Sequence, residues 1–246
     1  MPIMNPSVRT ELVHRLGEAV RSPAIWCLVA VVALATRSLF ADPTRLLDSL
    51  GDTDDATRLV TVREFLAGAP WYDTTLPRFG VPDPLVSHWS RLVDYPLAVL
   101  MAAFSFLTSL EHAELATRFV WPLIVLFFIL WFIIGEAERE MGLLGALIAL
   151  GFAITCDSAL FQFNIGRIDH HNVQILFAVS GLTLLARSLD DDRVGWASGA
   201  CLGLGLAVGY EAIGLAIGAV TIAALATVCA RRFILAVAFS AVAPAC

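Results

Sequence analysis

An acid and two histidines stand together in residues 166–171 (Gly-Arg-Ile-Asp-His-His), between two apolar runs that are each long enough to enter a membrane. Ionisable side chains at such a place are costly to keep, so they indicate a functional site. Asp169 and His171 are two residues apart, and a regular helix would point their side chains about 200° apart. On an extended turn the two side chains can converge. A carboxylate with an imidazole is a ligand pair that suits Mn²⁺ or Zn²⁺.

A second group of carboxylates lies far upstream, in residues 52–55 (Asp-Thr-Asp-Asp). In an extended loop, Asp52 and Asp54 present their carboxylates on the same face. Arg58, four residues after Asp54, would pair with it if a helix begins there. The same acids also fit the N-cap of a helix in a solvated loop. His88 adds an imidazole beside a tryptophan, and on its own it fits an interfacial side chain better than a ligand.

The composition is that of an integral membrane protein. Hydrophobic residues make up 58% of the 246 residues and charged residues 15%, whereas soluble domains have about 45–50% and about 25%. A net charge of −6 argues against nucleic acid as a partner. We predict an all-α polytopic bundle that forms a single transmembrane domain over residues 1–246.

The apolar runs predict six full spans and the start of a seventh. They cover residues 24–41, 115–135, 142–161 and 172–186, two halves of the tract 195–230 broken at residues 209–211, and a last run that reaches Cys246. Glu211, at the break, is predicted to be a solvated turn residue. Residues 42–94 form a long external loop, with a short amphipathic helix on the membrane surface at residues 56–67.

The side on which the acidic clusters lie depends on residues 97–110. At 14 residues, this segment has the length of an interfacial or re-entrant piece. If it does not cross, the basic turns share the cytoplasmic side with the basic flank at residues 1–22 (Arg139, Arg187, Arg193, Arg231 and Arg232). Both acidic clusters then face the external side. We predict this topology, with the N-terminus cytoplasmic, in a plasma membrane of the bacterial inner-membrane type.

The order of these features resembles the catalytic subunit of oligosaccharyltransferases, which are membrane glycosyltransferases of the GT-C class. In that family one span leads into a long external loop that opens with an Asp-x-Asp motif, matched here by residues 52–55. The loop closes with a proline-containing stretch ending in His-Trp, matched by residues 82–89. A second Asp-x-Asp/Glu/His motif follows two spans later, matched by residues 166–171. The resemblance covers the N-terminal part of the family pattern.

The resemblance implies a divalent cation, Mn²⁺ or Mg²⁺, held by Asp54, Asp169 and His171. We accordingly assign catalysis to the motif acids Asp52, Asp54 and Asp169, and cofactor binding to His88 and Arg58. The resemblance also implies an external cavity that takes a polyprenyl-linked sugar donor from the membrane lipid. Its (pyro)phosphate end would lie beside the cation, and the reaction would be metal-dependent transfer of a sugar or glycan.

The chain departs from the family after this point. It stops at Cys246 within an apolar run and lacks the soluble domain with a Trp-Trp-Asp motif. We therefore expect a truncated product, a shorter branch, or a separate C-terminal partner chain. Two other classes stay open: an incomplete membrane subunit that needs a partner, and a transporter, since acids and histidines also line ion paths. The chain lacks the internal repeat typical of transporters.

Overall fold

The computed structural model describes residues 22–41, 50–80 and 82–230, most of them helical. The helices are α2 (Pro23–Ala41), α4 (Thr53–Leu66), α5 (Arg91–Ser105), α6 (Leu110–Thr155), α7 (Asp157–Leu160), α8 (His170–Ser188), α9 (Gly195–Val208) and α10 (Ile213–Ala230). Strands β1 (Thr75–Leu76) and β2 (Leu85–Val86) form an antiparallel pair, and 3₁₀ turns cover Phe161–Phe163, Asp192–Val194 and Tyr210–Ala212. The basic N-terminal flank, residues 42–49 of the predicted external loop and the last apolar run after Ala230 lie outside the described residues.

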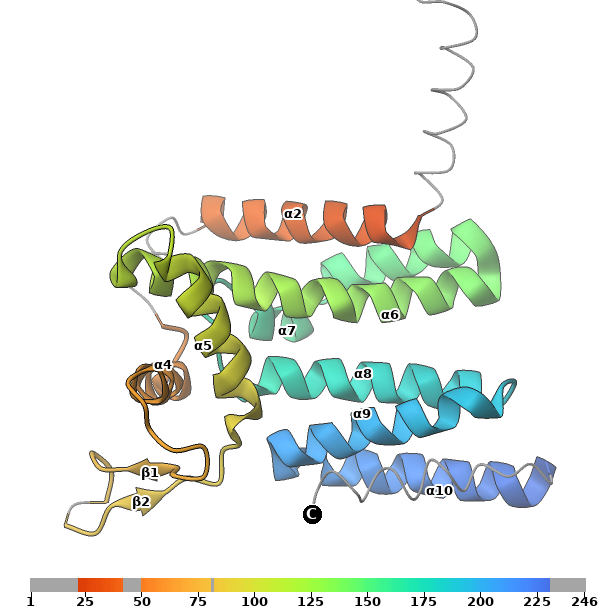
Figure 1. Ribbon diagram of the computed structural model, residues 1–246. Helices are drawn as coiled ribbons and strands as arrows, with labels where there is room; N and C mark the ends of the chain where they lie inside the picture. The colour runs from red at the N-terminus through yellow and green to blue at the C-terminus, as the bar shows by residue number, and fades with distance from the viewer. Residues whose placement is uncertain (1–21, 42–49, 81, 231–246) are drawn as a thin grey trace, which may run out of the picture.

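The long helices α2, α6, α8, α9 and α10 run along a common direction and pack into a bundle (Figure 1). α6 is itself a hairpin, because the backbone at Gly142 leaves the helical conformation with φ 64° and ψ −158°. A positive φ of this kind favours glycine. The turn is tight, since a Cβ placed at Gly145 would lie 2.2 Å from the carbonyl oxygen of Ala137. The two arms of α6 correspond to the helices that the sequence predicts over residues 115–135 and 142–161, but the first arm begins earlier, at Leu110, and the second ends earlier, at Thr155.

Two helices are long and apolar enough to cross a membrane: α2 over Pro23–Phe40, and α6 within Leu110–Thr155. The described residues are mostly helical, as the sequence predicts, with one two-stranded hairpin, while the count of six to seven spans stays a prediction. The break in the last apolar tract is also observed, between Val208 and Ile213.

α4, α5 and the β-hairpin gather at one end of the bundle, where α4 and α5 lie across the direction of the long helices (Figure 1). α5 contains most of the segment predicted to be interfacial. It packs against α4, and Leu59 and Val62 of α4 share the main hydrophobic core with Leu97 and Met101 of α5. The apolar face of α4, expected on a membrane surface, is therefore buried mainly against protein.

Helices at this end begin at polar side chains that satisfy their first N–H groups. Asp52 caps α4, Ser90 caps α5, Ser109 caps α6 and Asp169 caps α8, each accepting a hydrogen bond from a backbone N–H of the first turn. Such caps stabilise a helix start because these N–H groups have no partner within the helix. Two of the acids assigned to catalysis are thus also helix caps.

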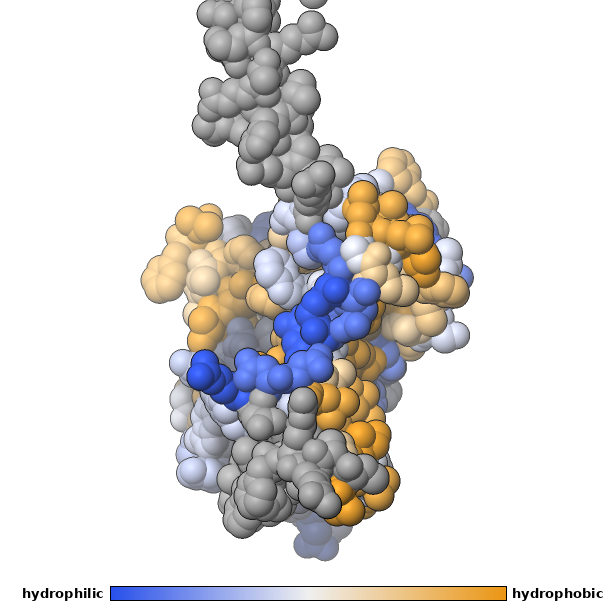
Figure 2. All heavy atoms as spheres, turned by 90° about the vertical axis from the view of Figure 1, so that its right-hand side faces the viewer, coloured by the Kyte–Doolittle hydropathy of each residue, from blue (hydrophilic) through white to orange (hydrophobic). Residues whose placement is uncertain are grey.

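The other end of the bundle carries a cluster of ion pairs between the turn of α6 and the end of α8. Glu136 binds Arg139 at 2.7 Å and Arg187 at 2.5 Å, and Arg139 also lies 3.6 Å from Asp190. Figure 2, which looks onto this end, shows a hydrophilic band with hydrophobic residues on both sides. Arg187 and Asp169 lie at opposite ends of α8, which has 19 residues and is therefore about 28 Å long.

Candidate metal centre

The first acidic cluster forms a capping box at the start of α4. Oδ1 of Asp52 accepts hydrogen bonds from the backbone N–H groups of Asp54 at 2.9 Å and Asp55 at 3.2 Å. The N–H of Asp52 in turn donates to Oδ2 of Asp55 at 3.1 Å. The N-cap interpretation of this stretch therefore holds for Asp52.

Asp55 connects this cap to the second motif. Its Oδ1 accepts hydrogen bonds from the backbone N–H groups of Ile168 at 2.7 Å and Asp169 at 2.8 Å, and its Oδ2 binds Nη1 of Arg167 at 2.8 Å. Arg167 also pairs with Asp52. Asp55 is fully buried and Arg167 nearly so. Both acidic clusters thus meet at one end of the bundle, with Asp55 fixing the backbone that carries Asp169.

The guanidinium of Arg167 also favours the ionised form of Asp52. Partial burial opposes ionisation of the Asp52 carboxyl, but the hydrogen bond and charge of Arg167 outweigh it and lower its pKa. Close packing supports this pair, because a Cβ placed at Gly51 would lie 2.4 Å from Cδ of Arg167.

Asp169 stands on an extended turn, as the sequence predicts, with φ −65° and ψ 166°. The turn begins at Gly166, whose φ of 94° favours glycine and whose N–H donates to the carbonyl oxygen of Arg118 at 3.0 Å. Asn172 closes it from the helix side by donating to the carbonyl oxygen of Arg167 at 3.2 Å. Hydrogen bonds therefore fix the backbone of the turn both before and after Asp169.

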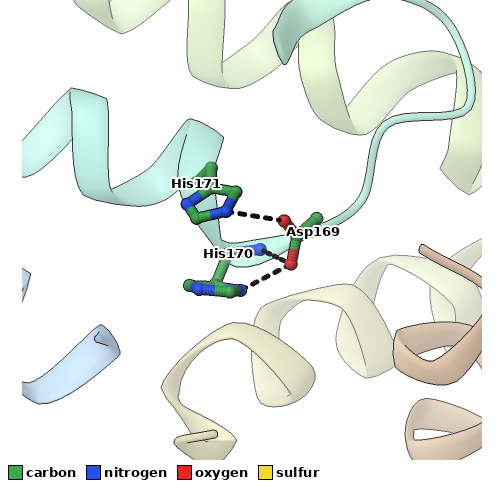
Figure 3. A group of neighbouring side chains, drawn as sticks. All are labelled: Asp169, His170 and His171. Atoms are coloured by element: carbon green, nitrogen blue, oxygen red, sulfur yellow. Dashed lines mark hydrogen bonds and ion pairs between the residues drawn. The ribbon is translucent and has the colours of Figure 1, made fainter. Parts of the chain in front are cut away.

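Asp169, His170 and His171 converge, with one ligand atom from each lying within 4.8 Å of the others (Figure 3). Oδ1 of Asp169 accepts a hydrogen bond from the backbone N–H of His170 at 2.6 Å, and it lies 2.5 Å from Nδ1 of the His170 ring. Oδ2 of Asp169 is buried without a hydrogen-bond partner in the described chain, and it lies 3.6 Å from Nε2 of His171.

These donor atoms fit a divalent cation. Burial opposes ionisation of Asp169, but the hydrogen bonds and charge of His170 outweigh it and lower the pKa of Asp169 to about 2, so the group is a carboxylate at neutral pH. Carboxylate and imidazole ligands lie about 2.0–2.2 Å from ions such as Zn²⁺ and Mg²⁺. Two ligand atoms 3.6 Å apart can therefore flank one ion.

Trp89, near the end of the loop between α4 and α5, contacts this centre. Its ring centroid lies 5.4 Å from that of His170, and the guanidinium carbon of Arg58 lies 4.6 Å from the Trp89 ring centroid. The expected pairing of Arg58 with Asp54 is wrong. Arg58 is fully buried and binds Asp94 at 2.6 Å, because a buried guanidinium needs a counter-charge within the core. Arg58 thus contacts Trp89, which in turn contacts His170 of the centre, and the assignment of Arg58 to cofactor binding stays a prediction.

Asp54 and His88 are not part of the converging group. Asp54 is half-buried in the first turn of α4, and no hydrogen bond or ion pair engages its carboxylate within the described chain. His88 is exposed at the end of the loop. The structure therefore brings together Asp169 and His171 of the predicted metal ligands, whereas the role of Asp54 stays a prediction.

Three residues near the centre were given no functional role from the sequence: Asp55, Gln174 and Glu211. His170 was counted in the motif but was not assigned as a ligand. Glu211 is not simply a solvated turn residue, because its Oε2 accepts a hydrogen bond from Nε2 of Gln174 at 2.9 Å and its Oε1 lies 3.7 Å from Nε2 of His170. The hydrogen bond from Gln174 lowers the pKa of Glu211. One signal was available: Gln174 follows His171 by three residues, so both face the same side of α8.

Comparison of the chain with protein-family models, curated proteins and solved structures finds no match. The chemistry open to the centre follows from its donor atoms. A carboxylate with two imidazoles can hold a transition-metal or similar divalent ion, and such an ion stabilises negative charge on a phosphoryl oxygen.

Proposed function

We propose that this protein is a metal-dependent membrane glycosyltransferase of the oligosaccharyltransferase type. It binds Mn²⁺ or Mg²⁺ at Asp169 and His171 and transfers a sugar or glycan from a polyprenyl (pyro)phosphate carrier. The observation that carries the proposal is the buried Oδ2 of Asp169, which has no hydrogen-bond partner in the described chain and faces Nε2 of His171. A buried acceptor without a partner is destabilising, and a cation between these two atoms would satisfy both.

The surrounding acids suit the transfer of a group from a phosphate. A bound cation would stabilise the charge that develops on the departing lipid phosphate. Asp169 and His171 hold their ligand atoms in place through the turn that Asp55 fixes. The carboxylate of Asp54, beside Asp55, has no hydrogen bond or ion pair within the described residues, so it is available to orient the acceptor or to complete the cation's ligands.

The proposed topology has six to seven spans, a cytoplasmic N-terminus and the centre on the external face of a bacterial-type plasma membrane. Large apolar side chains are exposed along α2, the second arm of α6 and α10, including Leu28, Val32, Leu144, Ile148, Phe152, Ile217, Ile222 and Leu225. Soluble monomers rarely expose such extended apolar surface. The ion-pair cluster with Arg139 and Arg187 lies at the end away from the centre, which supports a cytoplasmic placement of that end.

Titration of the purified protein with Mn²⁺ tests the metal centre. Wild type should bind saturably, and Asp169→Asn and His171→Gln should each lose most of the binding because each removes or weakens a ligand. Asp83→Asn and His112→Gln are matched controls, since both residues are exposed. If wild type does not bind Mn²⁺, or if both ligand variants bind like the controls, the proposed centre is wrong.

The reaction has its own test. Water can take the sugar in the absence of an acceptor, so incubation of a polyprenyl-linked sugar with the protein and Mn²⁺ should hydrolyse it to free sugar and the polyprenyl phosphate or polyprenyl pyrophosphate. Asp169→Asn should abolish this release. Turnover only after a C-terminal partner chain is added would identify an incomplete subunit instead.

The Asp54→Ala variant should be tested in both the Mn²⁺ titration and the reaction. Loss of Mn²⁺ binding would place Asp54 among the ligands, whereas retained binding with lost turnover would assign it to the acceptor.

Cysteine labelling tests the topology in intact cells. In a variant without the five native cysteines, Asp83→Cys and Glu111→Cys should react with a membrane-impermeant maleimide, and Glu140→Cys should react only after permeabilisation. All three positions are exposed. Glu111 follows the segment at residues 97–110, so its labelling only after permeabilisation would show that this segment crosses the membrane.

A further inference from the structure

Glu211 reaches the centre from a different part of the chain than the two motifs. It lies in the 3₁₀ turn between α9 and α10, at the same end of the bundle as Asp169 (Figure 1). Its Oε2 accepts a hydrogen bond from Nε2 of Gln174 at 2.9 Å. An ionised carboxylate can only accept hydrogen bonds, so it fixes which end of the Gln174 amide faces it.

The orientation of Gln174 determines the protonation pattern of His171. With its nitrogen held by Glu211, the amide presents Oε1 to Nδ1 of His171 at 3.0 Å. A carbonyl oxygen only accepts, so Nδ1 carries the hydrogen. A neutral imidazole has one N–H, so Nε2 of His171 keeps a free lone pair.

That lone pair faces the cation site. Nε2 of His171 lies 3.6 Å from Oδ2 of Asp169, and two acceptors cannot hydrogen-bond each other. If the hydrogen were on Nε2 instead, Nε2 of His171 could donate a hydrogen bond to Oδ2 of Asp169. Neither of these two atoms would then be free to bind a cation. The tautomer that Glu211 selects is therefore the one that leaves the site ready for a cation.

Gly209 leaves the space that this hydrogen-bonded chain needs. A Cβ placed at Gly209 would lie 2.3 Å from Nε2 of Gln174 and 2.4 Å from Oε2 of Glu211. Any larger side chain would therefore push apart the two atoms that form the hydrogen bond, while leaving the charge of Glu211 in place.

We infer that Glu211, acting through Gln174, is a positioning residue that holds Nε2 of His171 free to bind the divalent cation. The inference rests on the proposed metal function for its purpose, but the tautomer itself can be measured without metal. Hydrogen-bond partners that orient metal-binding histidines commonly change metal affinity about 10–100-fold when they are removed.

The first experiment is a set of Mn²⁺ titrations. Glu211→Gln should weaken binding about 10–100-fold, because its amide can donate to Gln174 and let that side chain turn over. Gly209→Ala should weaken binding as well, although it keeps the carboxylate. The exchanged pair Gln174→Glu with Glu211→Gln should restore affinity, since a carboxylate at 174 still accepts from Nδ1 of His171. Glu111→Gln, which removes an exposed charge from the same end, is the control.

The second experiment reads the tautomer in the metal-free protein. Imidazole ¹⁵N shifts, recorded about two pH units above the usual histidine pKa of about 6.5, should place the hydrogen of His171 on Nδ1 in wild type and in the exchanged pair. In Glu211→Gln the hydrogen should be shared between both nitrogens.

The outcomes separate the two proposals. Wild-type Mn²⁺ binding that Asp169→Asn abolishes but Glu211→Gln and Gly209→Ala leave unchanged would overturn the positioning role and keep the metal centre. Absence of Mn²⁺ binding in wild type would overturn the proposed function, and the ¹⁵N measurement would still decide the tautomer. Hydrogen on Nε2 of His171 in metal-free wild type would overturn the inference regardless of affinity.

Discussion

The Asp55→Ala variant should lose the fixed arrangement of residues 167–169, and with it most of the affinity of the centre for Mn²⁺. Asp55 is the acceptor for the buried N–H groups of Ile168 and Asp169. Each buried donor left without a partner costs about 1–3 kcal/mol, so the two together cost about 2–6 kcal/mol. A typical domain has only about 5–15 kcal/mol of stability, so the loss is large. Arg167 would keep Asp52 as its counter-charge.

Asp54→Ala is the matched comparison for this variant, because it removes the same group from the neighbouring position. Thermal unfolding in detergent should show a large decrease in Tm for Asp55→Ala and almost none for Asp54→Ala. Mn²⁺ titration of both variants then separates a structural role from a ligand role. Equal decreases in Tm would mean that the hydrogen bonds of Asp55 do not stabilise the turn.

The Asp94→Asn variant should destabilise the end of the bundle formed by α4 and α5. Asp94 is buried and binds Arg58 at 2.6 Å and Arg91 at 2.8 Å, and both arginines are buried as well. An amide at this position would leave two buried guanidinium groups without a counter-charge. Breaking a buried pair in this way costs about 3–5 kcal/mol. Because α4 carries Asp52 and Asp55, the centre should loosen too.

Limited proteolysis measures this effect where it is expected. The loop between α4 and α5 should be cut faster in Asp94→Asn than in wild type, and Mn²⁺ affinity should fall. Asp83→Asn removes an exposed acid from the same loop and should behave like wild type. If Asp94→Asn is also cut at the wild-type rate, the ion pairs do not hold this end together.

Local patterns in the sequence predicted the helical elements well. The apolar runs predicted α2, α8 and both arms of α6, and residues 209–211 predicted the break before α10. Asp169 was expected on an extended turn at a helix start, and it is the N-cap of α8. These features depend on composition, periodicity and capping within a few neighbouring residues, which a single sequence contains.

Contacts between distant residues were not predictable in the same way. Asp54 and Asp55 are chemically identical, and only the contact with residues 167–169 shows that Asp55 is the one that fixes the turn. Arg58 has a suitable acid four residues before it, yet it binds Asp94 because that acid lies in the same buried core. Glu211 is exposed in a turn, as the sequence predicts, but its hydrogen bond with Gln174, 37 residues earlier, was not predictable. Each of these pairings depends on tertiary packing.

The separation of Asp55 and Arg167 along the chain means that Asp55 is synthesised well before its ion-pair partner. The two residues are 112 positions apart, and ribosomes add about 5–20 residues per second. Asp55 therefore emerges about 6–22 seconds before the guanidinium that neutralises it. During that interval the acidic start of α4 has no buried partner and must stay hydrated. The end of the bundle that carries the centre can close only after α6 and the turn before α8 have been made.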